Sequence, residues 1–429
     1  MTPLSKRRPF AALGLSLVLF LVLLGGCSLL EQREAAQTTF QQVAAGGGHT
    51  CGLTRGGGVR CWGNNREGEL GHGGAAGSLT PVDVQGLASG VAAISAGRWF
   101  TCALTRGGGV KCWGGNDYGQ LGDGSAQTRR RTPVDVRGLA RGVAAISTGL
   151  WHTCALTIGG GVKCWGWNTH GQLGDGTGIQ RLTPVEVVNL DHVVSLSAGD
   201  THTCAVTRSG GVKCWGNNGS GQRGDGGSGW GRPEPVEVAG IHDAVAVSAG
   251  GEHTCALTRG GVVKCWGSND KGQLGDGSRT TRWTPAEVQG LAGGVAAISA
   301  GEIHTCALTN AGALKCWGGN GFTRMGEDSF LWNALGDGSD PDHDTHSVRG
   351  HRTAPVDVQG LSAGVSAISA GRGYTCAVTG DGAIKCWGSN NFGQLGDGST
   401  AKRLTPVDVR ALPVSPIQQT DENKERDEE

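Results

Sequence analysis

The stretch HTCALTRGGVVKCWG, residues 253–267, decides the fold of this chain. Versions of it occur seven times, each with two cysteines ten residues apart. The first cysteines of successive copies are separated by 50 to 52 residues, and by 70 residues between the last two copies. A period near fifty residues is too long for a helix pair and is typical of one blade of a β-propeller.

Each copy reads as four short strands. In the second copy these are expected at residues 91–95, 101–105, 109–114 and 133–136, with glycine-rich turns between them. Pro133 opens the fourth strand, and proline is tolerated at the start of an outer strand. No long amphipathic helix pattern interrupts the repeat. The sequence therefore predicts an all-β, seven-bladed propeller with four short antiparallel strands per blade.

The paired cysteines can be placed by strand arithmetic. If Cys102 lies opposite Cys112, residues 103 and 104 face 111 and 110, and residues 106–108 form the turn. Directly opposed cysteines can form a cross-strand disulfide, the expected state in an exported protein. Zinc is the alternative because histidine precedes most first cysteines, but ten-residue spacing is not a zinc spacing. The predicted disulfides are Cys51–Cys61, Cys102–Cys112, Cys154–Cys164, Cys204–Cys214, Cys255–Cys265, Cys306–Cys316 and Cys376–Cys386.

Two further residues recur with the repeat. A tryptophan follows every second cysteine, and seven copies of one side chain indicate packing between blades rather than an active site. An aspartate lies between two glycines in six copies, where it favours a turn in which the side chain bonds its own backbone, with calcium binding as the alternative. The residues are Trp62, Trp113, Trp165, Trp215, Trp266, Trp317 and Trp387, and Asp123, Asp175, Asp225, Asp276, Asp337 and Asp397.

The N-terminus is typical of a targeting segment. Basic residues 6–8 precede an apolar stretch that ends in Leu24-Gly25-Gly26-Cys27. This ending resembles a bacterial lipobox, which predicts a signal peptide over residues 1–27 and lipidation of Cys27. A plain signal peptide or an uncleaved anchor is the alternative. Residues 28–40 then form a polar tether, and residues 415–429 form an acidic tail too polar to order itself.

Charge limits the partners. The chain has 37 basic and 37 acidic residues, so its net charge is zero. This argues against nucleic acid as a partner and against an electrostatic membrane contact. We expect membrane contact only through the lipid anchor, an extracytoplasmic location at the cell envelope or surface, and a monomer.

The recurring pattern resembles the regulator of chromosome condensation (RCC1) repeat family. Residues 249–258 and 263–277 show it best, and the resemblance covers residues 43–411. It implies a seven-bladed propeller over residues 41–414 but no single function. The copies depart from the pattern at Arg223, at Glu69 and His72, and at an insertion over residues 321–352. Whether the last strand completes the first blade as a clasp, or each copy forms its own blade, stays open.

Two positions in the unit vary freely and are therefore candidates for recognition. One precedes the second strand and the other follows the Trp-Gly pair; aromatic residues there are typical anchors for a partner. Solvated turns are the alternative. The predicted partner-binding residues are Arg98, Trp99, Phe100, Tyr118, Leu150, Trp151, His170, Glu302, Trp332, Arg372, Tyr374 and Phe392.

The insertion is a second candidate region. Its apolar half could pack over a propeller face or contact a partner. Its acidic and histidine-containing half offers weak metal candidates, although a solvated loop is the favoured interpretation. These candidates are Asp340, Asp342, His343, Asp344 and His346. We predict no resident metal and no cofactor.

Function follows from what the pattern offers. The sequence contains no unique catalytic set, so the leading hypothesis is a lipid-anchored, non-catalytic scaffold that binds a protein partner through its loops. The first alternative is an enzyme, a hydrolase or lyase acting on polysaccharide or peptide at the central funnel. A glycan-binding module is the second. Guanine-nucleotide exchange, suggested by the family name, conflicts with a signal peptide because that activity needs a cytosolic GTPase.

Overall fold

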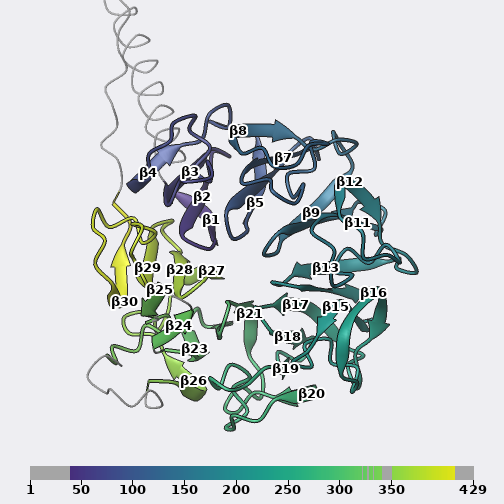
Figure 1. The fold of residues 1–429 in the computed structure, drawn as a ribbon. Helices are drawn as coiled ribbons and strands as arrows, with labels where there is room; N and C mark the ends of the chain where they lie inside the picture. Colours follow the sequence, from purple (N-terminus) through teal and green to yellow (C-terminus); the bar gives the residue numbers. More distant parts are fainter. Residues whose placement is uncertain (1–38, 321, 326–327, 332, 341–349, 411–429) are drawn as a thin grey trace, which may run out of the picture.

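A computed structural model shows the arrangement of the chain (Figure 1). It describes residues 39–320, 322–325, 328–331, 333–340 and 350–410, with the backbone alone between 322 and 331. The described strands form seven four-stranded antiparallel sheets arranged as a ring, together with one separate two-stranded sheet. The predicted seven-bladed propeller is therefore confirmed.

Each blade is built from consecutive strands of one repeat copy, except where the insertion intervenes in the sixth. Blades 1 to 3 comprise β1 (Phe40–Ala45), β2 (His49–Thr54), β3 (Val59–Gly63) and β4 (Ser78–Asp83); β5 (Val91–Ala96), β6 (Phe100–Thr105), β7 (Val110–Gly114) and β8 (Arg130–Asp135); and β9 (Val143–Thr148), β10 (His152–Thr157), β11 (Val162–Gly166) and β12 (Arg181–Glu186). Blades 4 and 5 comprise β13 (Val193–Ala198), β14 (His202–Thr207), β15 (Val212–Asn218) and β16 (Gly229–Glu237); and β17 (Ala244–Ala249), β18 (His253–Thr258), β19 (Val263–Gly267) and β20 (Arg282–Glu287). Blades 6 and 7 comprise β21 (Val295–Ala300), β22 (His304–Thr309), β23 (Leu314–Gly318) and β26 (Arg352–Asp357); and β27 (Val365–Ala370), β28 (Tyr374–Thr379), β29 (Ile384–Gly388) and β30 (Arg403–Asp408).

The cysteines have the predicted register. In blade 2, Cys102 pairs with Cys112, followed by Ala103 with Lys111 and Leu104 with Val110. All seven predicted disulfides are present, with Cα–Cα separations of 4.0 to 4.1 Å. Each crosslinks the second and third strands at the centre of its blade, where both cysteines are fully buried.

The ring closes without a clasp. Strand β30 remains in the last blade beside β29, and β1 pairs with β2 in the first. The alternative in which the C-terminal strand completes the first blade is therefore wrong. Side chains from both ends join the two blades instead, since Phe40 and Trp62 of blade 1 pack in one apolar cluster with Ile384 and Leu395 of blade 7.

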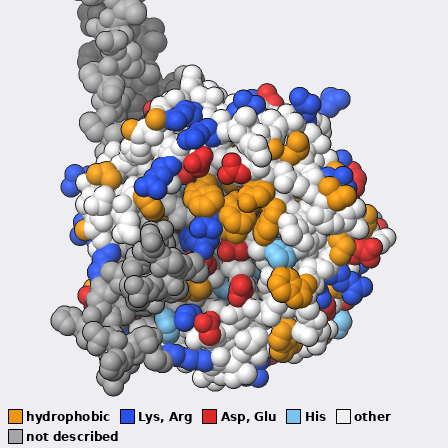
Figure 2. Space-filling model, viewed as in Figure 1, with side chains coloured by type: hydrophobic (Ala, Val, Ile, Leu, Met, Phe, Trp, Pro, Cys, Tyr) orange, Lys and Arg blue, Asp and Glu red, His pale blue; other side chains and the backbone are white. Residues whose placement is uncertain are grey.

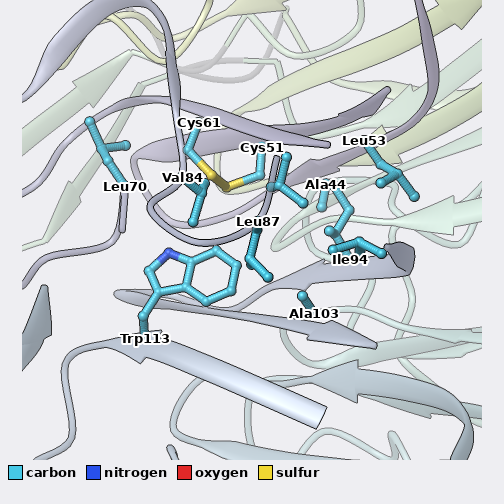
Figure 3. Close-up of a cluster of buried hydrophobic side chains, with 12 residues drawn as sticks. Ala44, Cys51, Leu53, Cys61, Leu70, Val84, Leu87, Ile94, Ala103 and Trp113 are labelled. Carbon is cyan, nitrogen blue, oxygen red and sulfur yellow. A yellow bond between two sulfur atoms is a disulfide. The ribbon is translucent and has the colours of Figure 1, made fainter. Parts of the chain in front are cut away.

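The repeated tryptophans pack between blades, as predicted. Trp113 of blade 2 lies in the apolar cluster of blade 1, against the Cys51–Cys61 disulfide, Leu70 and Leu87 (Figure 3). The same arrangement recurs around the ring. All seven tryptophans are fully buried. Large aromatic side chains therefore supply much of the apolar contact that holds one blade against the next.

Each of these junctions also contains one shared carbonyl. The Trp Nε1–H and the threonine hydroxyl that precedes the first cysteine both donate to a single backbone oxygen of the preceding blade. The tryptophan bonds measure 2.7 to 3.0 Å. The accepting oxygens belong to Gln394, Glu69, Gln120, Gln172, Gln222, Gln273 and Ala334. Two buried donors are thus satisfied at every junction, as burial requires.

The residue before that threonine contacts the following blade, whereas the tryptophan and the threonine contact the preceding one. In five blades it is a fully buried histidine whose Nε2 lies 2.8 to 2.9 Å from the threonine hydroxyl of the following blade. Phe100 and Tyr374 replace it in blades 2 and 7 and are also fully buried. The Tyr374 hydroxyl bonds the carbonyl of His49 across the ring closure. Placing Phe100 and Tyr374 on the binding surface was therefore wrong.

The insertion begins at the end of the third strand of blade 6. It contains a hairpin of β24 (Phe322–Met325) and β25 (Asp328–Leu331). Trp332, Asp342, His343, Asp344 and His346 lie outside the described residues, as do Cys27, residues 28–38 of the tether, and the tail. Phe40, predicted as the end of the tether, instead begins strand β1. Within the described ranges, no helix has the length and apolar character needed to cross a bilayer.

Candidate functional site

Both variable positions open on the same face of the propeller. In an antiparallel meander, the end of the first strand and the end of the third lie at the same edge. The turn before the second strand and the loop after Trp-Gly therefore project together, and the chain enters the insertion from the end of the third strand of blade 6 at this same edge. Figure 2 shows it, with apolar side chains gathered beside the central opening. We call it the loop face.

The turn before the second strand divides into two rings. Its first variable residue lines the mouth of the central channel, and we call these residues the inner ring. Its second variable residue lies further out. The inner ring comprises Gly47, Arg98, Leu150, Asp200, Gly251, Glu302 and Arg372. Four of the predicted partner-binding residues, Arg98, Leu150, Glu302 and Arg372, thus meet around one axis although they come from four different blades.

An aromatic strip runs across blades 2 to 4 on the loop face. Tyr118 and Trp167 each lie against Trp151, with ring centroids 5.2 Å apart in both pairs. The strip continues to Trp99 at one end, 6.0 Å from Trp151. At the other end His170 contacts Trp167 at 5.2 Å and stacks on Trp230 at 6.4 Å. The aromatic strip comprises Trp99, Tyr118, Trp151, Trp167, His170 and Trp230.

The sequence predicted four members of the strip and missed two. Trp167 occupies the position directly after Trp-Gly, where other copies have asparagine, glycine or serine, so its departure from the repeat was the available signal. Trp230 lies near the start of the long strand β16 of blade 4, and it is 87% exposed. An exposed tryptophan that adjoins further aromatic rings is typical of an interaction surface.

Backbone hydrogen bonds hold the strip in place. The amide of Trp167 donates to the carbonyl of Trp151 at 2.9 Å, which ties the two variable loops of blade 3 together. The amides of Tyr118 and His170 donate to the side-chain oxygens of Gln120 and Gln172 at 2.9 and 3.0 Å. The anchors are therefore positioned before any partner arrives, which lowers the entropy cost of binding.

The aspartates of Gly-Asp-Gly have the predicted turn role. In all six, a carboxylate oxygen accepts the backbone amide two residues later, at 2.9 to 3.1 Å. The sequence missed that each also pairs with an arginine, which usually begins the fourth strand. In blade 4 this arginine is Arg223 itself, 3.0 Å from Asp225, which explains its place in a position held by leucine elsewhere.

Four charged side chains of the inner ring meet at the channel mouth. Arg372 of blade 7 spans it, bonding Glu302 of blade 6 and lying 3.7 Å from Asp200 of blade 4. Arg98 turns the other way and lies over Trp99, 4.2 Å from the ring centroid, and 5.7 Å from that of Trp151. These residues border a cavity of about 110 Å³, which we call the axial pocket.

Burial shifts the titration of the carboxyl groups in this pocket. It raises the pKa of Glu302 to about 7, against the opposing influence of Arg372. Burial also raises the pKa of Asp200, again opposed by Arg372 and Arg98. Moreover, Glu302 Oε2 is buried without a hydrogen-bond partner. Perturbed carboxyl groups in a concave site are typical of functional positions.

The remaining predicted residues are more peripheral. Phe392 of blade 7 is partly exposed on the loop face, with the Arg66 guanidinium 5.8 Å from its ring centroid. Asp340 is exposed and lies 3.4 Å from Lys402. In the part of the chain that the structure describes, no group of three or more His, Cys, Asp or Glu residues is arranged to hold a metal ion.

Comparisons with known proteins agree with this architecture. The family described as "RCC1-like domain" matches residues 27–294, and RCC1 repeats match residues 295–323, 365–394 and 381–420. The ultraviolet-B receptor UVR8 of Arabidopsis thaliana is 31% identical over 87% of this chain and 82% of its own length. The secretion-regulating guanine nucleotide exchange factor of Bos taurus is 30% identical over 87% of this chain and 71% of its own.

Solved structures show the same fold. Yeast RCC1 (Prp20), in a crystal structure bound to Kap60, superposes with a TM-score of 0.66 and 22% identity, covering 78% of each chain. Since the sequence matches extend over most of the repeat array and the blades reproduce the repeat as single sheets, the chain belongs to the RCC1 repeat family.

Proposed function

We propose that this chain is a non-catalytic scaffold that binds a protein partner on its loop face. The observation that carries the proposal is the aromatic strip, six rings in continuous contact across three blades, ending in Trp230, which is 87% exposed. Aromatic residues dominate the energy of protein interfaces, because they bury large apolar areas with few side-chain torsions to freeze.

Two features of the relatives support this reading. The structure of the yeast relative contains Kap60 as a bound protein. The bovine relative is named a guanine nucleotide exchange factor, an activity exerted on another protein. We do not extend exchange activity to this chain, because its N-terminal residues predict export, where no cytosolic GTPase is available. We propose instead a location outside the cytoplasm, held by lipid on Cys27.

A capture experiment with matched variants tests the proposal. The full-length oxidised chain is immobilised beside a variant with Trp99, Trp151 and Trp230 changed to alanine. A control variant carries Ile158→Ala, because Ile158 is 76% exposed but lies in a turn at the opposite face. Retained proteins from envelope and culture fluid are identified by mass spectrometry, and their binding to each variant is measured.

We expect one protein to be retained by the native chain and by Ile158→Ala, but not by the triple variant. A polysaccharide retained in that same pattern would favour the glycan-binding alternative. If retention is the same for all three chains, the aromatic strip is not the recognition surface and the proposal fails.

A further inference from the structure

The axial pocket contains an acceptor without a donor. The side chain of Glu302 is 8% exposed, and Arg372 donates a hydrogen bond to its Oε1. Its Oε2 is buried with no hydrogen-bond partner. A carboxylate can accept several hydrogen bonds, and leaving one oxygen unpaired in a buried place is costly. A donor supplied from outside the chain would remove that cost.

The charges around the pocket are unevenly placed. Asp200 and Glu302 belong to blades 4 and 6, and the inner-ring position of the blade between them is Gly251, which has no side chain. Arg372 is the one guanidinium within 4.0 Å of either carboxylate among the described residues, and it serves both. Arg98 is occupied by its contact with the rings of Trp99 and Trp151. Arg98 also acts on both carboxyl groups, but at longer range, so among the described residues Arg372 is the one cation paired directly with the two carboxylates.

Close packing of the backbone around the pocket limits the size of a ligand. Seven glycines, one from each blade, line the pocket and approach one another closely. A Cβ atom on Gly149 would lie 2.3 Å from the carbonyl oxygen of Gly199, and one on Gly250 would lie 2.4 Å from that of Gly301. Backbones this close leave a shallow cavity of about 110 Å³, enough for a small head group but not for a folded segment.

We propose that the axial pocket binds an ammonium or guanidinium group. This group lies between Asp200 and Glu302 and donates a hydrogen bond to Glu302 Oε2. Such a cation pairs the unsatisfied acceptor and lies closer to the two carboxylates than Arg98 does. The pocket adjoins the aromatic strip through Arg98, so one source of the cation is a lysine or arginine side chain of the protein partner, and this source rests on the proposed function. The other source is a free diamine, which would bind whether or not the proposed function holds.

The test is calorimetric titration of the full-length oxidised chain, purified in detergent. The small probes are Nα-acetyl-lysine methylamide, its glutamate counterpart and putrescine. A seven-residue peptide with a central lysine between leucines is the partner-like probe. The variants are Glu302→Gln, which removes the charge and keeps the shape, and Glu252→Gln as control, an exposed carboxylate of the same face outside the pocket. Near-ultraviolet circular dichroism checks that each variant is folded.

We expect the lysine probe to bind at least tenfold more tightly than the glutamate probe. Glu302→Gln should weaken it at least tenfold, and Glu252→Gln less than twofold. Preference for the glutamate probe, or equal affinity in the native chain and Glu302→Gln, would overturn the proposal.

The remaining outcomes separate the two sources. A peptide that binds tenfold more tightly than the lysine amide, with the gain abolished by Trp167→Ala, identifies a partner side chain. Putrescine that binds as tightly as the peptide in both chains identifies a free cation. In that case the cation site stands while the aromatic strip loses its role as the protein-binding surface.

Discussion

The layer between blades and the loop face are built on opposite principles. Between blades, the same tryptophan, threonine and carbonyl recur at all seven junctions. On the loop face, no two blades have the same inner-ring residue except the glycines of blades 1 and 5 and the arginines of blades 2 and 7. Repetition indicates what the ring needs to fold, and variation indicates where it can recognise something. Four changes test this division.

Removing all seven disulfides should have the largest effect. Each closes a short hairpin and contributes about 2–3 kcal/mol in the chain-entropy model, so together they contribute on the order of 15–20 kcal/mol. We expect the chain refolded under reducing conditions to lack the near-ultraviolet dichroism of its buried tryptophans. The double change Cys204→Ala and Cys214→Ala should lower stability by about 2–3 kcal/mol in urea titration. A fully reduced chain with native dichroism would show that inter-blade packing suffices alone.

Acid should act on the junctions next. Burial lowers the pKa of His49, His152, His202 and His304 to about 3 and that of His253 to about 4. A lowered folded-state pKa gives stability that is complete above the unfolded value near 6.5 and is lost as the pH falls below it. At pH 5 each of these histidines lowers the free energy of unfolding by about 2 kcal/mol. Glu69 and Glu302 act in the opposite sense, because burial raises their pKa to about 7.

The two carboxyl groups offset about half of the effect of the five junction histidines, so these seven groups leave a loss of about 5 kcal/mol between pH 7 and pH 5. His351, whose pKa burial lowers to about 4, adds to this loss in the same sense. Urea midpoints across this range measure it. His152→Phe is the matched variant, because blade 2 already has Phe100 at this position. We expect it to reduce the steepness of the pH dependence by one proton. An unchanged slope would show that the junction histidines are not the groups that titrate on unfolding.

A single junction tryptophan should matter more for stability than an exposed one. Trp266 is fully buried and its Nε1–H donates to the carbonyl of Gln222 at 2.9 Å. Trp266→Ala should cost about 3–5 kcal/mol, since it leaves a cavity and the carbonyl of Gln222 keeps only the hydroxyl of Thr254 as a donor. Trp230→Ala, at 87% exposure, should change stability by less than about 0.5 kcal/mol and impair only binding. Equal losses for the two would remove the distinction between junction and loop face.

The same division explains what the sequence could predict. The period and the cysteine spacing determined the blades, the strand register and the disulfides, because these depend on neighbours within one copy. The burial of Phe100 and Tyr374 was predicted wrongly, although both replace a histidine that bonds the next blade. The meeting of Arg372 with Asp200 could not be derived, because only ring closure brings blades 4 and 7 across one axis.

The smallest effects should come from the ion pairs, and they separate turn from strand within one blade. Asp175 is buried in its turn, 2.7 Å from Arg181, and its Oδ1 accepts the amide of Thr177. Hydrogen bonds and the charge of Arg181 hold the pKa of Asp175 below its usual range, although burial opposes this. Glu186 pairs with Lys163 at 2.5 Å on the strand surface, where 64% of the glutamate is exposed.

Asp175→Asn should therefore cost about 1–2 kcal/mol, because Arg181 loses its partner in a half-buried site. Glu186→Gln should cost less than about 0.5 kcal/mol, because solvent screens an exposed pair. Urea titration at pH 7 measures both changes. The Asp175→Asn effect should also be lost as the pH falls through the lowered pKa of Asp175, because the native carboxyl is then protonated as well. Blade 1 shows that the turn survives without the carboxylate, since His72 Nδ1 there accepts the amide of Gly74 at 3.0 Å. If Glu186→Gln cost as much stability as Asp175→Asn, burial would not be the reason that the turn aspartates contribute more to stability than the exposed pairs.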